Sequence, residues 1–168
     1  MDVRILSGRL DATAELDRFD HFAAGAGAIV SFVGKVRSEG GNVGTLHLDH
    51  HPELTLRSLH AIGAAASLHW PIEEVLVIHR VGDMAADEPI VLVAVAARHR
   101  REAFEACDYI VDHLKSRALL WKCETGPAGR SWIETRLADE DDIARWGDKA
   151  LSFEDMLASP ATRDRPGR

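Results

Sequence analysis

The sequence predicts a single α+β domain, in which a mainly antiparallel sheet is packed against helices. Segments with strand patterning alternate along the chain with segments whose apolar residues recur every three or four positions. The 168 residues are 46% hydrophobic and 28% charged, which suits one domain with a buried core. We see no internal repeat and no long linker. We therefore expect one domain over 1–136 and a C-terminal extension over 137–168, where the composition changes.

The first fifty residues predict three strands and one helix. An apolar strand over 3–6 is followed by a helix over 11–22, whose apolar residues have helical spacing. The run 28–37 predicts a strong strand. The alternating segment 43–50 follows turn-forming residues, so we expect it to pair with that strand as a hairpin.

The middle of the chain predicts one helix and two buried strands. Pro52 stands at the first position that proline favours in a helix, and this helix is expected to run to about Leu68. A strand follows over 75–81. The continuous apolar run 90–96 is typical of a strand that is buried on both faces.

The last part of the chain predicts a long helix, a hairpin and the extension. Apolar residues recur at three- and four-residue steps over 99–117, which predicts the best helix in the sequence. The segments 120–124 and 131–134 flank a glycine- and proline-containing turn and are expected to form a closing hairpin. A further helix is expected over 143–157, and 160–168 is expected to be disordered.

Charge and cysteine content exclude several classes of protein. The net charge of −7 and the lack of a basic stripe argue against a nucleic-acid or membrane binder. Two cysteines, Cys107 and Cys123, do not form a disulfide framework, and both are expected to be packing residues. Neither a secretion signal nor a membrane-length apolar run is present, so a cytoplasmic location is expected.

Two lysines near the end of the long helix are the leading candidates for chemistry. Lys115 lies in the last helical turn, and Lys122 follows a short reversal on the outward face of a strand that it shares with Glu124. The opposite face of this strand carries Trp121 and Cys123, which are expected in the core. A lysine partly shielded from water can act as an acid, base or nucleophile, and two of them suit an anionic substrate.

Other cations are expected to complete an anion site. His99 and Arg100 stand where a buried strand ends and a helix begins. The free backbone N–H groups at the N-terminus of a helix favour an anion. Lys35 and Arg37 point to one face at the end of another strand.

The two ends of the long helix are too far apart to serve one small pocket within a single chain. His99 and Lys115 are sixteen positions apart, or about 24 Å along a helix. We therefore expect a symmetric homodimer, in which His99 and Arg100 of one copy face Lys115, Lys122 and Arg37 of the other.

A histidine cluster leaves a metal-dependent enzyme open as an alternative. Alternation places His47, Asp49 and His51 on one strand face and His50 on the other. No fourth ligand is evident, and we favour a polar strand end without a metal.

Five short segments carry a family resemblance in their order and spacing: Ser31–Arg37, Val77–Gly82, Val93–Phe104, Leu114–Arg117 and Trp121–Glu124. On these, from about residue 2 to 136, the chain resembles the large, catalytic subunit of molybdopterin synthase. The resemblance implies an α/β hammerhead-type fold. It also implies a dimer flanked by two copies of a small ubiquitin-like sulfur carrier, which together form a heterotetramer.

The same resemblance implies a sulfurtransferase in molybdenum cofactor biosynthesis. The carrier ends in Gly-Gly bearing a thiocarboxylate, and its tail delivers sulfur to cyclic pyranopterin monophosphate. Two transfers create the dithiolene of molybdopterin, with no tightly held cofactor and no metal in the enzyme. A non-catalytic anion-binding module with the same basic pocket remains the alternative.

The resemblance also implies roles for individual residues. Lys115 would be the catalytic lysine and Lys122 its assisting partner. Arg37, His99 and Arg100 would hold the cyclic phosphate. The pocket lining would include Lys35, Val36, Cys123 and Glu124, although the family usually has a basic residue where Cys123 stands.

Overall fold

The strands form two four-stranded sheets in a computed structural model that describes residues 1–127, 129–133 and 137–158. The first sheet has the order β1 (Asp2–Leu6), β4 (Ile72–Arg80), β6 (Pro89–Ala97) and β2 (Ala28–Lys35). The second has the order β5 (Gly82–Ala85), β3 (Thr45–His50), β7 (Leu120–Gly126) and β8 (Gly129–Ile133). β1 and β4 are parallel and all other pairs are antiparallel. The expected α+β class is confirmed.

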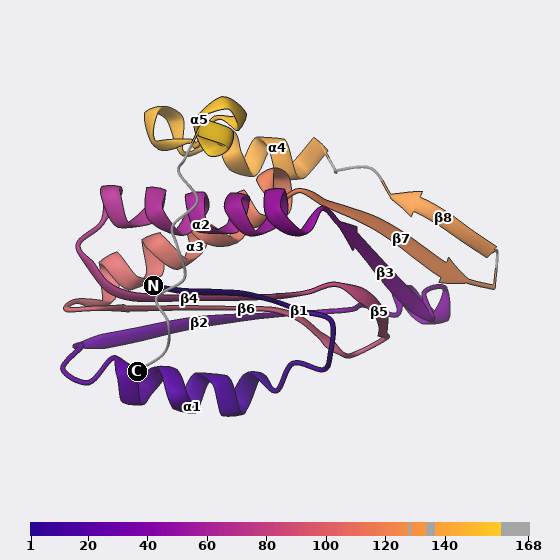
Figure 1. Ribbon diagram of the computed structural model, residues 1–168, viewed down its shortest axis with the longest axis horizontal. Coiled ribbons are helices and arrows are strands. Elements are labelled where there is room, and N and C mark those ends of the chain that lie inside the picture. The colour runs from indigo at the N-terminus through magenta and orange to yellow at the C-terminus, as the bar shows by residue number, and fades with distance from the viewer. Residues whose placement is uncertain (128, 134–136, 159–168) are drawn as a thin grey trace.

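Helices cover both faces of the first sheet (Figure 1). α1 (Ala12–Phe22) lies on one face, while α2 (Pro52–His69) and α3 (Arg100–Arg117) lie on the other. The second sheet extends beyond the end of this layered body. No helix in the described ranges combines the length and the apolar character that crossing a bilayer demands.

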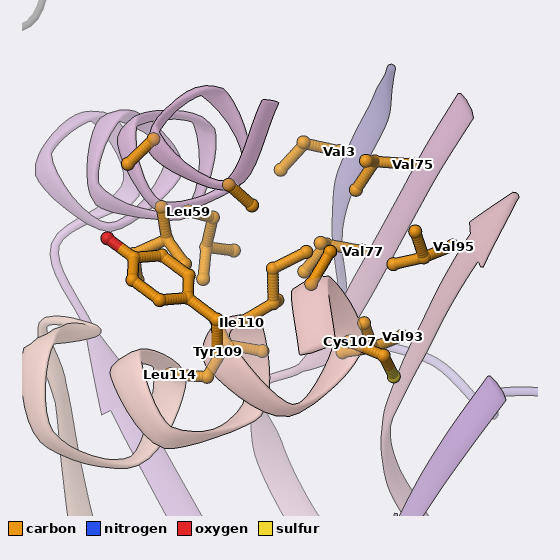
Figure 2. Packing of buried hydrophobic residues seen from close by; sticks show 14 of the residues in the cluster. Val3, Leu59, Val75, Val77, Val93, Val95, Cys107, Tyr109, Ile110 and Leu114 are labelled. Carbon is orange, nitrogen blue, oxygen red and sulfur yellow. The ribbon is translucent and has the colours of Figure 1, made fainter. Parts of the chain in front are cut away.

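Burial on both faces explains why β4 and β6 have nearly continuous apolar sequences. On the α2 and α3 side, Val77, Val93 and Val95 pack with Tyr109 and Ile110 of α3 (Figure 2). Full burial of each such side chain is worth about 1.5–3 kcal/mol. On the α1 side, alternate residues of the same strands form a second cluster: Leu76, Ile78, Leu92, Ala94 and Ala96. The two-faced burial expected of 90–96 is confirmed.

Local capping sets where α1 and α2 begin. The Asp11 carboxylate accepts a hydrogen bond from the Ala14 N–H at 3.0 Å. α2 starts at Pro52, and the preceding His51 accepts at Nδ1 from the Leu54 N–H at 3.4 Å. α2 therefore starts at Pro52 as expected, and α1 starts one residue after Asp11.

The expected hairpin between the strands at 28–37 and 43–50 is wrong. β2 pairs with β6, whereas β3 belongs to the second sheet and pairs with β5 and β7. The connection contains a 3₁₀ turn, Glu39–Gly41, in which Gly40 and Gly41 have φ of 69° and 91°. Such left-handed conformations favour glycine and redirect the chain out of the first sheet. Alternation had indicated which face of β3 is buried but not which strand it pairs with.

The expected helix over 143–157 is also wrong, because the segment is interrupted. It contains the end of α4 (Leu137–Ala144), a 3₁₀ turn (Gly147–Lys149) and most of α5 (Phe153–Ala158). Gly147 has φ of 51°, which breaks the helical path. Ile143 and Met156 are nonetheless buried, and α4 and α5 contact α3 and α2, so the extension packs on the domain. The disorder expected over 160–168 lies outside the described residues.

Candidate active site

A cavity of about 710 Å³ opens where the two sheets meet the last turn of α3. The first sheet contributes Phe32, Gly34, His79 and Val91, and the second contributes Leu46, Leu48, Lys122 and Glu124. The end of α3 and the following reversal contribute Val111, Leu114, Lys115, Ala118 and Leu120. The wall is therefore largely apolar, with a few charged groups projecting from it.

Four cationic side chains line this one cavity: Lys35, Arg37, Lys115 and Lys122. Sequence reasoning had placed them on three separate elements. Two carboxylates, those of Glu39 and Glu124, line the same space. Positive charges therefore outnumber negative ones along the described wall, which favours an anionic ligand.

The end of β2 presents Lys35 and Arg37. Between them, the backbone of Val36 is held on both sides: its N–H donates to the Glu88 carbonyl at 3.0 Å, and its carbonyl accepts from the Asp87 N–H at 2.9 Å. Val36 is itself buried and lines the cavity. Arg37 forms an ion pair with Glu39 at 3.1 Å. These contacts fix the strand end, while the side chains of Lys35 and Arg37 are exposed.

The reversal between α3 and β7 brings Lys115 and Lys122 to the same cavity. Ala118 ends the helix with an extended backbone, and the Leu120 N–H donates to its carbonyl at 2.8 Å. The buried Thr55 of α2 donates its hydroxyl to the Leu119 carbonyl at 2.7 Å. In the single chain Lys115 is exposed and Lys122 is half-buried, so Lys122 is the more shielded of the two.

Cys123 does not line the cavity. It is buried on the other face of β7, and its Sγ accepts a hydrogen bond from Arg130 Nε at 3.0 Å. The expectation that Trp121 joins Cys123 in the core is wrong, since Trp121 is 51% exposed. The two residues share a face of β7, but only Cys123 is buried there.

His99 and Arg100 are exposed at the far end of α3, away from the cavity of their own chain. α3 begins at Arg100, with His99 as its N-cap. A single copy therefore does not bring these residues to the cations around Lys115, as the length of the helix indicated. Their participation through a second copy stays a prediction.

The metal alternative finds no support in the described part of the chain. His47 Nδ1 lies 2.7 Å from the Asp83 carboxylate, whereas His51 caps α2. No group of three or more histidine, cysteine, aspartate or glutamate side chains there is placed to hold a metal ion.

One cavity residue, His79, was missed as a site residue. It stands near the end of β4, is 7% exposed and lines the cavity. Burial lowers its pKa to about 4, opposed by a hydrogen bond to the Arg80 carbonyl and reinforced by the Lys122 charge. A histidine within an apolar strand was the available signal, because such a polar group needs a partner or a function.

A layered α+β domain thus surrounds a largely apolar cavity whose charged groups are mainly cationic, which is the kind of site that suits an anionic small molecule. The family model described as "MoaE protein" matches residues 7–117, more than half of the chain. The chain belongs to this family, and the resemblance stated from the sequence is confirmed.

Individual relatives agree with this assignment. A molybdopterin synthase catalytic subunit from Cereibacter sphaeroides is 42% identical over 146 residues, covering 87% of this chain and 100% of the relative. One from Vibrio cholerae is 48% identical over 123 residues, covering 72% and 82%.

Solved structures show the same fold. The molybdopterin biosynthesis MoaE protein from Burkholderia ambifaria has a TM-score of 0.76 and 38% identity, covering 87% of this chain and 97% of that one. A complex of subunits 1 and 2 of molybdopterin-converting factor from Helicobacter pylori has a TM-score of 0.70. At 24% identity over 80% of this chain and 91% of that chain, the second similarity shows the fold alone.

Proposed function

We propose that this chain is the catalytic subunit of a molybdopterin synthase, which converts cyclic pyranopterin monophosphate to molybdopterin. The observation that carries the proposal is that Lys115 and Lys122 line one cavity together with Lys35 and Arg37. Family membership supports the same reaction. The expected cytoplasmic location goes with this proposal.

The proposed chemistry requires two anions to approach each other. A thiocarboxylate at the Gly-Gly end of a small ubiquitin-like carrier would bring sulfur to a pterin that bears a cyclic phosphate. Cationic side chains reduce the repulsion between them, and they act most strongly in a cavity that excludes water. Each transfer forms a carbon–sulfur bond on the pterin and breaks a carbon–oxygen bond there, with loss of water or opening of the cyclic phosphate. Water then hydrolyses the thioester that joins the pterin to the carrier, which leaves with a terminal carboxylate.

We assign the roles by position in the cavity. Lys115 is the catalytic lysine that exchanges protons with the reacting groups, and the more shielded Lys122 assists it. Arg37 binds the cyclic phosphate. Lys35, Val36 and Glu124 shape the wall around the pterin. Because Cys123 lies on the other face of β7, a role for it in substrate binding has the least support.

A second copy of the chain would complete the phosphate site. His99 and Arg100 are exposed beside the N-terminus of α3, where they can reach the cavity of a neighbouring copy. We therefore propose a symmetric homodimer, which becomes a heterotetramer when each copy binds one carrier. An active monomer, shown by light scattering at the assay concentration, would contradict this arrangement.

The function is tested by reconstitution. Purified chain, thiocarboxylated carrier and cyclic pyranopterin monophosphate are mixed, and the dithiolene product is assayed. Lys115→Ala should keep its oligomeric state and lose at least about 100-fold in turnover, as expected for a lost proton-transfer group. Lys149→Ala is the matched control, because Lys149 belongs to the extension and does not line the cavity. If the wild type makes no product and Lys115→Ala merely weakens anion binding, the chain is a non-catalytic anion-binding module.

A further inference from the structure

Arg80 carries a buried guanidinium that takes no part in the proposed reaction. It is the last residue of β4, only 3% of it is exposed, and it is not among the residues that line the cavity. A buried charge costs free energy unless it is paired and hydrogen-bonded. Because apolar residues of similar volume often stabilise a fold as well as a buried ion pair does, the presence of Arg80 points to a role beyond stability.

Arg80 is bonded to the short segment between β5 and β6. Its Nη1 donates to the Glu88 carboxylate at 3.3 Å and to the Pro89 carbonyl at 3.1 Å. The same carboxylate oxygen, Oε2, also accepts from the Ala85 N–H at 3.1 Å. One guanidinium nitrogen at the end of β4 is thereby connected to both ends of the turn over 85–89.

This turn in turn holds the end of β2, between Lys35 and Arg37. The Glu88 carbonyl accepts from the Val36 N–H at 3.0 Å, and the Asp87 N–H donates to the Val36 carbonyl at 2.9 Å. Asp87 has φ of 68°, a left-handed conformation that is less favourable for aspartate than for glycine. A turn that contains such a residue depends on contacts from outside it to keep its shape.

We propose that Arg80 is a positioning residue, which fixes the turn before β6 and through it the place of Arg37 at the cavity. The contacts run from Arg80 Nη1 to the Glu88 side chain, and from the Glu88 backbone to Val36. Arg37 follows Val36 directly, so a shift of the Val36 backbone would also displace the Arg37 guanidinium. The consequence for catalysis rests on the proposed function, in which Arg37 binds the cyclic phosphate.

The pattern of hydrogen bonds supplies matched variants. Nη1 makes both bonds to the turn, whereas Nε of Arg80 has no partner among the described residues. A lysine ammonium has three donors and can make both bonds, but methionine can make neither, so Arg80→Lys should preserve what Arg80→Met removes. Arg9 reaches the other oxygen of the Glu88 carboxylate from solvent, at 3.7 Å and with 89% of its side chain exposed. Arg9→Met is therefore the control.

The first test is independent of enzymatic activity and measures hydrogen exchange of individual amides in the full chain by NMR. In Arg80→Met, the amides of Val36 and Asp87 should exchange at least about 10-fold faster than in the wild type, because a hydrogen bond to a charged group no longer holds the turn. The central amides of β6 should accelerate much less. Arg80→Lys and Arg9→Met should stay within about threefold of the wild type at both positions.

Three outcomes of this experiment would overturn the proposal. Exchange at Val36 and Asp87 could be unchanged in Arg80→Met, or it could be as fast in Arg80→Lys as in Arg80→Met. The central amides of β6 could accelerate equally, which would show that Arg80 only stabilises the whole domain. If Arg80→Met does not fold, Glu88→Ala is measured in its place and judged in the same way, because it removes the oxygen that accepts from both Arg80 and Ala85.

The second test measures the consequence for the anion site. Arg80→Met should raise KM for cyclic pyranopterin monophosphate about 10-fold and keep kcat within about threefold, because a phosphate contact is weakened while Lys115 is untouched. Arg80→Lys and Arg9→Met should keep the wild-type KM. An unchanged KM in folded Arg80→Met would reject the link to the anion site. A wild-type chain that makes no product would reject the proposed function instead, and the exchange comparison would still decide whether Arg80 positions the strand end.

Discussion

The imidazole of His113 accepts a hydrogen bond at Nε2 from the backbone N–H of Leu151, with 3.0 Å between the two nitrogens. Its Nδ1 donates to the Tyr109 carbonyl at 2.8 Å, so the buried ring is neutral and satisfied at both nitrogens. Lys115 follows two residues later in α3. The C-terminal extension is thereby tied to the helical segment that leads to a cavity lysine.

Stability should depend on pH through the two buried imidazoles. Burial lowers the pKa of both His113 and His79 from the ordinary value of 6.5 to about 4. Below pH 6.5 these histidines bind protons in the unfolded chain but stay neutral in the folded chain. The free energy of unfolding therefore falls as the pH drops from 6.5 to about 4. Protonation of each histidine in the unfolded chain lowers the free energy of unfolding by roughly 3 kcal/mol as the pH falls through this window.

The measurement is urea unfolding at a series of pH values. His113→Gln should reduce the dependence of the unfolding free energy on pH over this range. His21→Gln is the control: its imidazole is exposed and its pKa is raised by the Asp17 carbonyl, so its removal should not flatten the curve. An unchanged slope in His113→Gln would show that the ring is protonated as readily in the folded state as in the unfolded one.

A buried carboxylate anchors the extension to α3. Asp112 is 4% exposed and accepts hydrogen bonds from Arg145 Nε at 2.9 Å and Trp146 Nε1 at 2.9 Å. Asp112→Ala should lower the free energy of unfolding by about 2–4 kcal/mol, because it leaves the donors of Arg145 and Trp146 without this partner. Asp108, which pairs with the same Arg145 at the surface, is the matched control. Asp108→Ala should cost less than about 1 kcal/mol by urea unfolding, and equal losses would contradict the anchor.

The hairpin that carries Lys122 depends on a close approach at Gly126. A Cβ placed there would lie 1.8 Å from the Asn42 carbonyl oxygen, so backbone must move. Gly126→Ala should therefore cost at least about 1–3 kcal/mol in thermal or urea unfolding. Gly8→Ala meets nothing within 4 Å and should be nearly neutral. If Gly126→Ala were as stable as the wild type, the backbone at Asn42 would have to move aside at little energetic cost.

Both thiols should be unreactive in the folded protein. Burial raises the pKa of Cys107 to about 12, and Cys123 has no exposed surface. An aromatic disulfide reagent at pH 8 should label neither cysteine over minutes and both after unfolding in guanidinium. Rapid labelling of one thiol in the native state, assigned by mass spectrometry, would reopen a role for that cysteine.

Local signals carried most of the element assignments. The proline at position 52 and the apolar periodicity of 99–117 both mark features that neighbouring residues determine. The strand β5 was missed, because its four residues, Gly82–Ala85, look like a polar bend and are ordered by pairing with β3. Pairing is a contact between distant segments, which periodicity does not encode.

Some residues of the candidate site could be identified from the sequence, and others only from the tertiary structure. Lys35, Arg37, Lys115 and Lys122 were identified from residue type and position, and they do line one cavity. Cys123 was placed among the pocket residues by resemblance, although strand alternation sets it on the other face. His79 could not be recognised as a cavity residue, because only the meeting of the two sheets brings it near Lys122.

By itself, the sequence determined the fold class, the positions of the main helices and strands, and the family to which the chain belongs. These follow from residue type, period and order, which are properties of the chain alone. Only the tertiary structure decided that β3 leaves the first sheet, that the extension packs on α3, and that a neutral imidazole lies among the cations. The reason is physical: burial, pairing and the pKa of His79 depend on groups brought together from distant parts of the chain.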